Sequence, residues 1–171
     1  MTKKFLSILL MITVAVGLFS VPVAAQEDEE LTIFSSMPNL AFPFFVHMQN
    51  QIEAEAEALG NIELLSADGQ NSAPKQTGDV EAAIVQGVDG IIISPLDVAA
   101  LAPAVQQAVE AGIPVVTIDR RVEGVEGVLA HVGADNVRGG ELQAEWVLEN
   151  YPDGATIFPL QGQPGAGPAI D

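Results

Sequence analysis

The chain has 171 residues, no cysteine and a formal net charge of −17, with 23 acidic residues against six basic ones. Such an acidic surface repels the phosphates of nucleic acids and anionic lipid headgroups, so neither is expected as a partner. The absence of cysteine excludes a disulfide framework and a cysteine nucleophile. It also excludes a lipid attached to a cysteine that follows a signal peptide.

The first 25 residues have the pattern of a secretory signal peptide. Two lysines near the start are followed by an apolar run, Phe5 to Val21, and small residues at 23–25 precede an expected cut before Gln26. The apolar run is nearly long enough to span a bilayer, so an uncleaved anchor is the alternative. Pro22 and the small-residue exit favour cleavage, and a freely soluble exported protein is therefore expected.

After an acidic, solvated leader at 26–30, predicted strands and helices alternate along the chain. Asp135 and Asn136 are expected to cap the last long helix, and Pro103 to mark a separate turn before the helix around it. This alternation, with short connections, predicts an α/β fold: a doubly wound parallel sheet covered by helices on both faces. Apolar runs predict strands at 31–35, 62–66, 88–94, 113–118, 128–132 and 155–160, and helices are expected at 44–59, between Pro74 and Gly87, from Asp97 past Val109, and at 136–150.

One stretch, Gly112 to Arg121, indicates a ligand site. Its apolar, β-branched part is typical of a strand buried on both faces, so Asp119 and Arg120 must emerge at the carboxyl end. In open α/β sheets ligands bind at that edge. A carboxylate beside a planar guanidinium suits a neutral, hydroxyl-rich molecule, because each hydroxyl both donates and accepts. A surface ion pair is the alternative interpretation.

The sequence offers little for other chemistry. His47 and His131 are far apart and have no ligand spacing around them, so neither a metal nor another cofactor is expected. There is no Gly-x-Ser-x-Gly elbow, and no enzyme is predicted, although an exported hydrolase remains an alternative that a turnover assay would test. The glycine-rich segment 162–167 could be read as a phosphate-binding loop, but it lacks the Lys-Ser/Thr pair and follows a late strand.

Six segments occur in a fixed order between about Leu31 and Asp171. They are Phe42–Phe45, Gln70–Asn71, Ile91–Asp97, Gly112–Arg120, Val132–Gly140 and Leu160–Gly165. Each segment is common by itself, whereas six in the same order make a specific signal, and together they resemble the periplasmic sugar-binding proteins of the ribose-binding type. A repressor core of related fold is the rival by topology, but the export signal and the lack of a DNA-binding headpiece argue against it.

The resemblance implies two α/β lobes that trap a sugar between them. Residues 31–133 would form an incomplete first lobe and 134–171 the beginning of a second similar lobe, with the boundary near Gly133-Ala134, so the chain is expected to be an N-terminal fragment. The implied function is that of a periplasmic solute-binding protein, a monomer, that delivers a small sugar to the permease subunits of an ABC importer. A sensory module that presents a sugar to a membrane receptor is the alternative.

The resemblance also implies binding residues. Phe44 and Phe45 match an aromatic pair that stacks on the apolar faces of the sugar ring, as aromatic planes can cover C–H faces. Phe45 also fits the core face of its helix, so a purely structural role is an equal alternative for it. Asp119 and Arg120 match the pair that hydrogen-bonds sugar hydroxyls.

The sequence departs from the family at two expected contacts. Phe42 stands where the family has an asparagine that bonds the sugar, and Ile170 aligns with a ribose-binding arginine. These departures argue against ribose itself, and a different sugar, larger or partly deoxygenated, is the alternative. Asn39, Gln70 and Asn71 are loop amides expected near the cleft, with turn formation as the alternative role of Asn71.

Overall fold

The protein is described by a computed structural model that covers residues 29–170. The predicted signal peptide and most of the acidic leader lie outside these residues. Within them, no helix is both long enough and apolar enough to cross a membrane.

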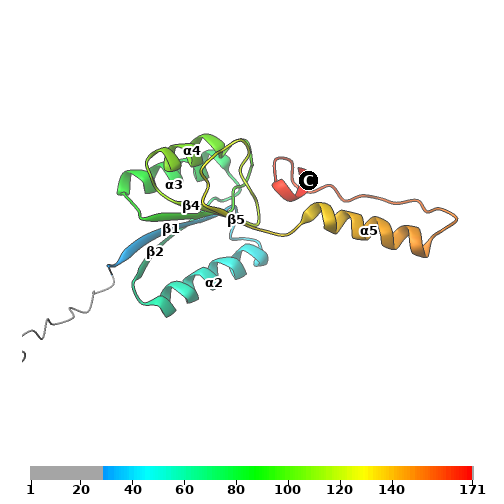
Figure 1. Cartoon of the computed structure of the whole chain (residues 1–171), viewed down its shortest axis with the longest axis horizontal. Coiled ribbons are helices and arrows are strands. Elements are labelled where there is room, and N and C mark those ends of the chain that lie inside the picture. Colours follow the sequence, from blue (N-terminus) through cyan, green and yellow to red (C-terminus); the bar gives the residue numbers. More distant parts are fainter. Residues whose placement is uncertain (1–28, 171) are drawn as a thin grey trace, which may run out of the picture.

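The centre of the structure is a five-stranded, all-parallel sheet with the order β2-β1-β3-β4-β5 (Figure 1). The first five predicted strands are all present, and the parallel α/β fold is confirmed. The first two strands run two residues further than predicted, and the other three are shorter. The strands are β1 (Leu31–Met37), β2 (Ile62–Asp68), β3 (Gly90–Ile93), β4 (Val115–Ile118) and β5 (Ala130–Val132).

Helices cover both faces of the sheet, as the alternation of elements predicts. The helix α2 (Pro43–Leu59) lies on one face, and α3 (Ala73–Gln86) and α4 (Ala102–Glu110) lie on the other (Figure 1). Each of the three has a proline in its first turn, where the missing N–H costs no helical hydrogen bond. Pro103 thus starts α4 rather than interrupting it, and a separate turn precedes this helix.

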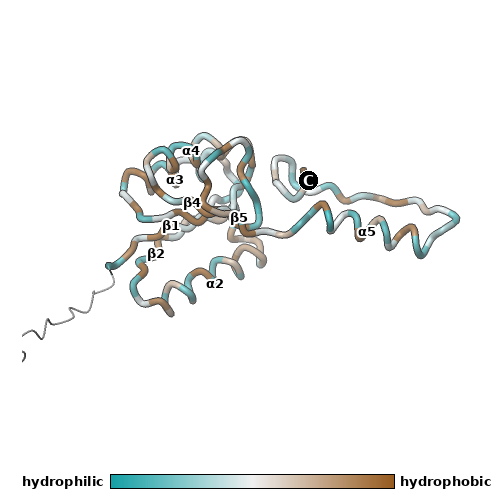
Figure 2. The backbone as a smooth tube through the Cα atoms, viewed as in Figure 1, coloured by the Kyte–Doolittle hydropathy of each residue, from teal (hydrophilic) through white to brown (hydrophobic). Residues whose placement is uncertain are grey.

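The main hydrophobic core lies between the sheet and the helices α3 and α4, and Figure 2 shows hydrophobic residues gathered along the strands. The opposite face is covered more loosely. There, Ile33, Ile52 and Leu64 are only partly buried and line a small apolar cavity of about 200 Å³. The core consists of Phe34, Val80, Ala83, Val88, Ile91, Ile93, Leu101, Ala104, Val105, Ala108 and Val115.

Beyond β5 the chain leaves the sheet. The helix α5 (Asn136–Asn150) has the predicted ends and stands apart from the sheet (Figure 1). Asp135 caps it as predicted, since its carboxylate accepts a hydrogen bond of 2.8 Å from the Arg138 N–H. The chain then returns toward the sheet and ends in a short helix, α6 (Gly167–Ile170).

The sixth strand predicted at 155–160 is wrong. This segment is not paired with any strand of the described residues, and Leu160 is 98% exposed. A strand needs a neighbour for its backbone N–H and C=O groups, and the apolar run alone does not supply one.

Core packing predicts a large loss of stability for Leu101→Ala. Leu101 is fully buried, so the substitution removes buried methyl groups and leaves a cavity, at a cost of about 2–5 kcal/mol. Urea denaturation of the full-length protein measures the change in the free energy of unfolding. Val85 on α3 is 87% exposed, and the control Val85→Ala is expected to cost less than about 0.5 kcal/mol. Equal losses in the two variants would contradict the packing described for this face.

Candidate functional site

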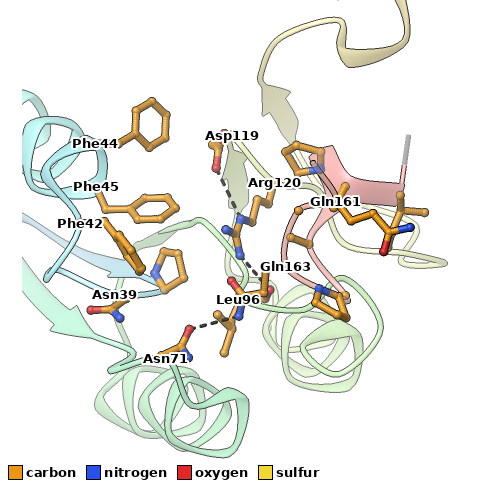
Figure 3. Close-up of a pocket in the computed structure, with 18 of the residues that line it drawn as sticks. Asn39, Phe42, Phe44, Phe45, Asn71, Leu96, Asp119, Arg120, Gln161 and Gln163 are labelled. Carbon is orange, nitrogen blue, oxygen red and sulfur yellow. Dashed lines mark hydrogen bonds and ion pairs between the residues drawn. The ribbon is translucent and has the colours of Figure 1, made fainter. Parts of the chain in front are cut away.

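A cavity of about 900 Å³ lies at the carboxyl edge of the sheet, between the strand ends and the segment 160–170 (Figure 3). The chain passes from β1 to β2 on one side and then to β3 on the other, so this edge contains the switch point where α/β sheets bind ligands. All six candidate residues named from the sequence line this cavity: Asn39, Phe42, Phe44, Phe45, Asp119 and Arg120.

Asp119 follows β4 directly and has a left-handed backbone conformation, with φ of 59°. This conformation is uncommon for residues other than glycine, although aspartate tolerates it better than most, and residues held in it cluster at functional sites. It is held by a hydrogen bond of 2.8 Å from the Asp119 N–H to the carbonyl of Val132. The buried strand and this fixed turn place the Asp119 carboxylate at the cavity (Figure 3).

Arg120 is held from three directions. Its Nη1 donates to the carbonyl of Leu96 at 2.9 Å, its guanidinium carbon lies 5.4 Å from the centre of the Phe45 ring, and its Nε lies 3.6 Å from Asp119 Oδ2. The side chain is only 12% exposed. The buried Nε has no hydrogen-bond partner among the described residues. An orphaned buried donor is unfavourable, so a ligand oxygen at this point would remove a cost that the free protein bears.

The electrostatics of the pair follow from its burial. Burial raises the pKa of Asp119 above its ordinary value of 3.8, while the charges of Arg120 and His131 oppose this increase. Burial also lowers the pKa of Arg120, against the attraction of Asp119. The guanidinium remains protonated at neutral pH, because the ordinary pKa of an arginine lies far above that range. The cavity therefore presents a carboxylate acceptor and a cationic donor, whose Nε has no hydrogen-bond partner among the described residues.

The two neighbouring phenylalanines have different environments. Phe45 is 6% exposed and packs beneath the Arg120 guanidinium, whereas Phe44 is 57% exposed. Their rings meet edge to face, with centroids 5.2 Å apart and planes at 71°. Phe45 thus has a packing role in addition to lining the cavity. Phe44 is the residue with a free aromatic face, and Phe42 at the N-terminus of α2 is similarly exposed at 53%.

The loop amides take part in turns as well as in the cavity wall. Gln70 and Asn71 both have left-handed backbones, with φ of 51° and 57°, so the turn interpretation of Asn71 holds. Asn39 Oδ1 accepts from the Ala41 N–H at 2.8 Å, which is an Asx turn. Asn39 and Asn71 line the cavity, and Gln70 does not.

The segment 160–170 forms the far wall of the cavity and is hydrogen-bonded to residues at the carboxyl edge of the sheet. Gln163 Nε2 donates to Asn71 Oδ1 at 3.1 Å (Figure 3), and the Val98 N–H donates to the carbonyl of Gly165 at 2.9 Å. A side chain at position 165 would overlap the carboxylate of Asp97. Glycine at this position therefore permits the close approach of the two walls.

The sequence did not identify two kinds of residue that line the cavity: one that contributes a backbone group, and others that lie in the segment 160–170. Leu96 lies in a segment singled out by the resemblance, but its carbonyl, the group that binds Arg120, carries no side-chain signal. Gln161 and Gln163 lie in Leu160–Gly165, another segment that carries the resemblance, but neither was named as a binding residue. Across residues 29–170, no group of three or more His, Asp or Glu side chains could hold a metal ion.

Comparisons with known proteins agree with this fold. The family described as the periplasmic binding protein domain matches residues 33–171. The ribose import binding protein RbsB of Bacillus subtilis is 42% identical over 145 residues, which cover 85% of this chain and 47% of that protein. The Caulobacter myo-inositol binding protein, solved with myo-inositol, superposes with a TM-score of 0.75 and 39% identity over 84% of this chain and 48% of its own.

A third relative is the fructose binding periplasmic domain of a hybrid two component system, with a TM-score of 0.77, 26% identity, and coverage of 82% of this chain and 46% of that chain. The chain belongs to the periplasmic binding protein family, and it is of the ribose-binding type that its sequence resembles. It spans about half the length of the relatives it matches. These relatives are named as binding proteins or domains rather than enzymes, as the sequence predicts.

The raised pKa of Asp119 predicts that Asp119→Asn keeps or increases the stability of the ligand-free protein at neutral pH. A carboxyl group whose pKa in the folded protein is raised above 3.8 stabilises the fold most at pH values below 3.8, where it is protonated. This stabilisation is lost as the pH rises through the pKa of the group in the folded protein. Asparagine does not ionise, and it tolerates a left-handed backbone. Melting temperatures of both proteins between about pH 4 and 7 measure the difference, which is expected to grow with pH. A variant that becomes relatively less stable toward pH 7 would contradict this.

Proposed function

We propose that this chain is the ligand-binding part of an exported protein that captures a small sugar or related polyol and delivers it to an ABC importer. The observation that carries this proposal is the pair Asp119 and Arg120, held at the carboxyl edge of the sheet with an unsatisfied buried Nε. A neutral polyol suits this pair, because one hydroxyl can accept from the guanidinium while another donates to the carboxylate. The relatives named for ribose and myo-inositol support the same ligand class.

We further propose that residues 31–133 form the first of two lobes and that 134–171 begin the second, after a signal peptide at 1–25 and a leader at 26–30. In support, β5 ends at Val132, and α5 stands apart from the sheet (Figure 1). The contacts of Gln163 and Gly165 with the sheet edge would hold such a two-lobed cleft closed. Ligand binding would then favour closure, because only the closed state makes contacts to the ligand from both walls.

The cavity lining bears on which polyol is bound. Polar groups come from the Asp119–Arg120 pair and a few amides, while Phe42, Phe44 and Ile170 supply apolar surface. A larger sugar or one that lacks some hydroxyls is therefore as suitable as ribose. Micromolar affinity requires about 8 kcal/mol, which a few hydroxyl hydrogen bonds and one stacked ring can supply. The protein is proposed to act as a periplasmic monomer, without cofactor or nucleic acid.

A sensory role is the second candidate, because one structural relative is the periplasmic domain of a hybrid two component system. In that case the closed, sugar-bound form would contact a membrane receptor instead of a permease. Co-purification of the sugar-loaded protein with permease subunits, together with loss of sugar uptake in a deletion strain, would support transport. Unchanged uptake with loss of a sugar-dependent transcriptional response would favour the sensor.

Asp119→Ala and Arg120→Ala are each expected to lower sugar affinity at least about 100-fold in the full-length protein, because each removes hydrogen bonds to a charged group. Isothermal titration calorimetry with D-ribose, D-allose, D-fructose and myo-inositol measures the affinity, and circular dichroism checks that the variants are folded. Glu110→Ala is the control, since Glu110 lies on α4 and does not line the cavity. Unchanged affinity in either alanine variant would refute the assignment of the site.

Phe44→Ala is expected to weaken binding by about tenfold, since a stacked aromatic ring contributes about 0.5–1.5 kcal/mol beyond the area it buries. The same calorimetric titration measures the change. Phe158→Ala is a matched control, because Phe158 is 89% exposed and lies outside the cavity lining. If the two substitutions have equal effects, Phe44 does not stack on the sugar.

A further inference from the structure

A fully buried glutamine lies behind the cavity without lining it. Gln76, on α3, has no exposed surface, and its amide makes three hydrogen bonds. Its Nε2 donates to Ser36 Oγ at 3.1 Å and to the Ser94 carbonyl at 2.8 Å. Its Oε1 accepts from the Leu96 N–H at 2.8 Å. Burying an amide is unfavourable unless its groups are bonded, and here both donor and acceptor capacity are used.

These bonds join the parts of the structure that support Arg120. Ser36 lies in β1, and Ser94 directly follows the end of β3. Leu96 lies in the turn beyond β3, and its two backbone groups point to different partners. Its N–H is bound by Gln76, and its carbonyl accepts from Arg120 Nη1 at 2.9 Å (Figure 3). A single residue thus separates the buried amide from the guanidinium.

We propose that Gln76 is a positioning residue for ligand binding, which acts by fixing the turn at 94–96 whose carbonyl anchors Arg120. This inference rests on the proposed function, because it assigns to Gln76 a role in the site that binds the polyol. The hydrogen bond of the Arg120 guanidinium in the described residues goes to this carbonyl, so the place of the carbonyl, together with the Phe45 ring and Asp119, sets where the guanidinium lies. A binding group must be held within about 0.5 Å of its productive position to be effective.

Loss of the amide would affect the turn directly. Without Gln76, the buried Ser94 carbonyl and the Leu96 N–H both lose their partner. Buried backbone groups rarely remain unpaired, so the turn would rearrange to find other partners or water. The Leu96 carbonyl would move with it, and Arg120 would lose its anchor while the rest of the sheet stayed in place.

The chain contains a matched control on the other face of the sheet. Gln49, on α2, is 4% exposed and also makes three side-chain hydrogen bonds. It bonds to Ser35 at 3.0 Å, Ser66 at 2.7 Å and Glu53 at 3.1 Å. Ser35 is the neighbour of Ser36 on β1, but neither Gln49 nor its three partners line the cavity. A purely structural glutamine is expected to behave like Gln49.

The test compares Gln76→Met, Gln49→Met and Arg120→Ala in the full-length protein. Methionine has nearly the shape of glutamine and cannot replace its hydrogen bonds. Affinity is measured by calorimetry with D-ribose and myo-inositol, and stability by thermal denaturation. The position of Arg120 in the ligand-free protein is followed by the NMR resonance of its Nε–H. This resonance is assigned by its absence from the spectrum of Arg120→Ala.

Both methionine variants are expected to melt at lower temperature. Gln76→Met is expected to shift or broaden the Arg120 resonance and to lose affinity by at least about tenfold, comparable to one hydrogen bond to a charged group. Gln49→Met is expected to keep both. The inference is overturned if Gln76→Met leaves the resonance and the affinity unchanged, or if Gln49→Met alters them as much.

Two further outcomes are separated by the design. If Arg120→Ala binds either sugar as the unaltered protein does, the proposed site fails. In that case, and also if neither of these two sugars binds, the resonance alone decides whether Gln76 holds Arg120. If Gln76→Met does not fold, Gln76→Glu replaces it, because a carboxylate keeps an acceptor for the Leu96 N–H but cannot donate to the Ser94 carbonyl. That variant is expected to displace the Arg120 resonance, and an unchanged resonance would overturn the inference.

Discussion

A buried guanidinium that is only partly satisfied by its own protein is the constraint on which the rest of this structure depends. Arg120 is stabilised by a backbone carbonyl, an aromatic face and a neighbouring carboxylate, yet its Nε is left without a hydrogen bond in the described part of the chain. Such an arrangement costs stability in the free protein. It is consistent with a site in which ligand oxygen atoms complete the set of bonds.

The parallel sheet makes this arrangement possible. β4 is held between β3 and β5, and the left-handed backbone of Asp119 then turns the chain so that both charged side chains reach the cavity. The sheet also carries a polar pair on its two faces, since the adjacent residues Ser35 and Ser36 bond to different buried glutamines. One of these networks reaches the binding residues through Leu96, and the other ends within the α2 face. Of the two buried glutamines, Gln76 is therefore connected to Arg120 at the carboxyl edge of the sheet, whereas the hydrogen bonds of Gln49 remain within the α2 face.

Much of the fold was predictable because it depends on local patterns. Apolar runs identified the first five strands, and Asp135 identified the start of α5. The predicted strand at 155–160 failed because an apolar run indicates a need for burial but not the presence of a pairing partner. Asp119 and Arg120 could be named from their place after a buried strand, whereas Phe42, Phe44 and Phe45 could be named only from the family resemblance. Burial of Gln76 could not be anticipated, because glutamine is usually exposed and its hydrogen-bond partners come from distant elements.

The central claim is that the carboxylate and the guanidinium at the end of β4 bind a neutral polyol without transforming it. A crystal structure of the full-length protein with the tightest-binding sugar of the panel tests it most directly. The account predicts intact sugar in the cleft, a sugar hydroxyl within about 3 Å of Arg120 Nε and a second hydroxyl on the Asp119 carboxylate. A sugar bound elsewhere, with these two side chains facing bulk water, would contradict it.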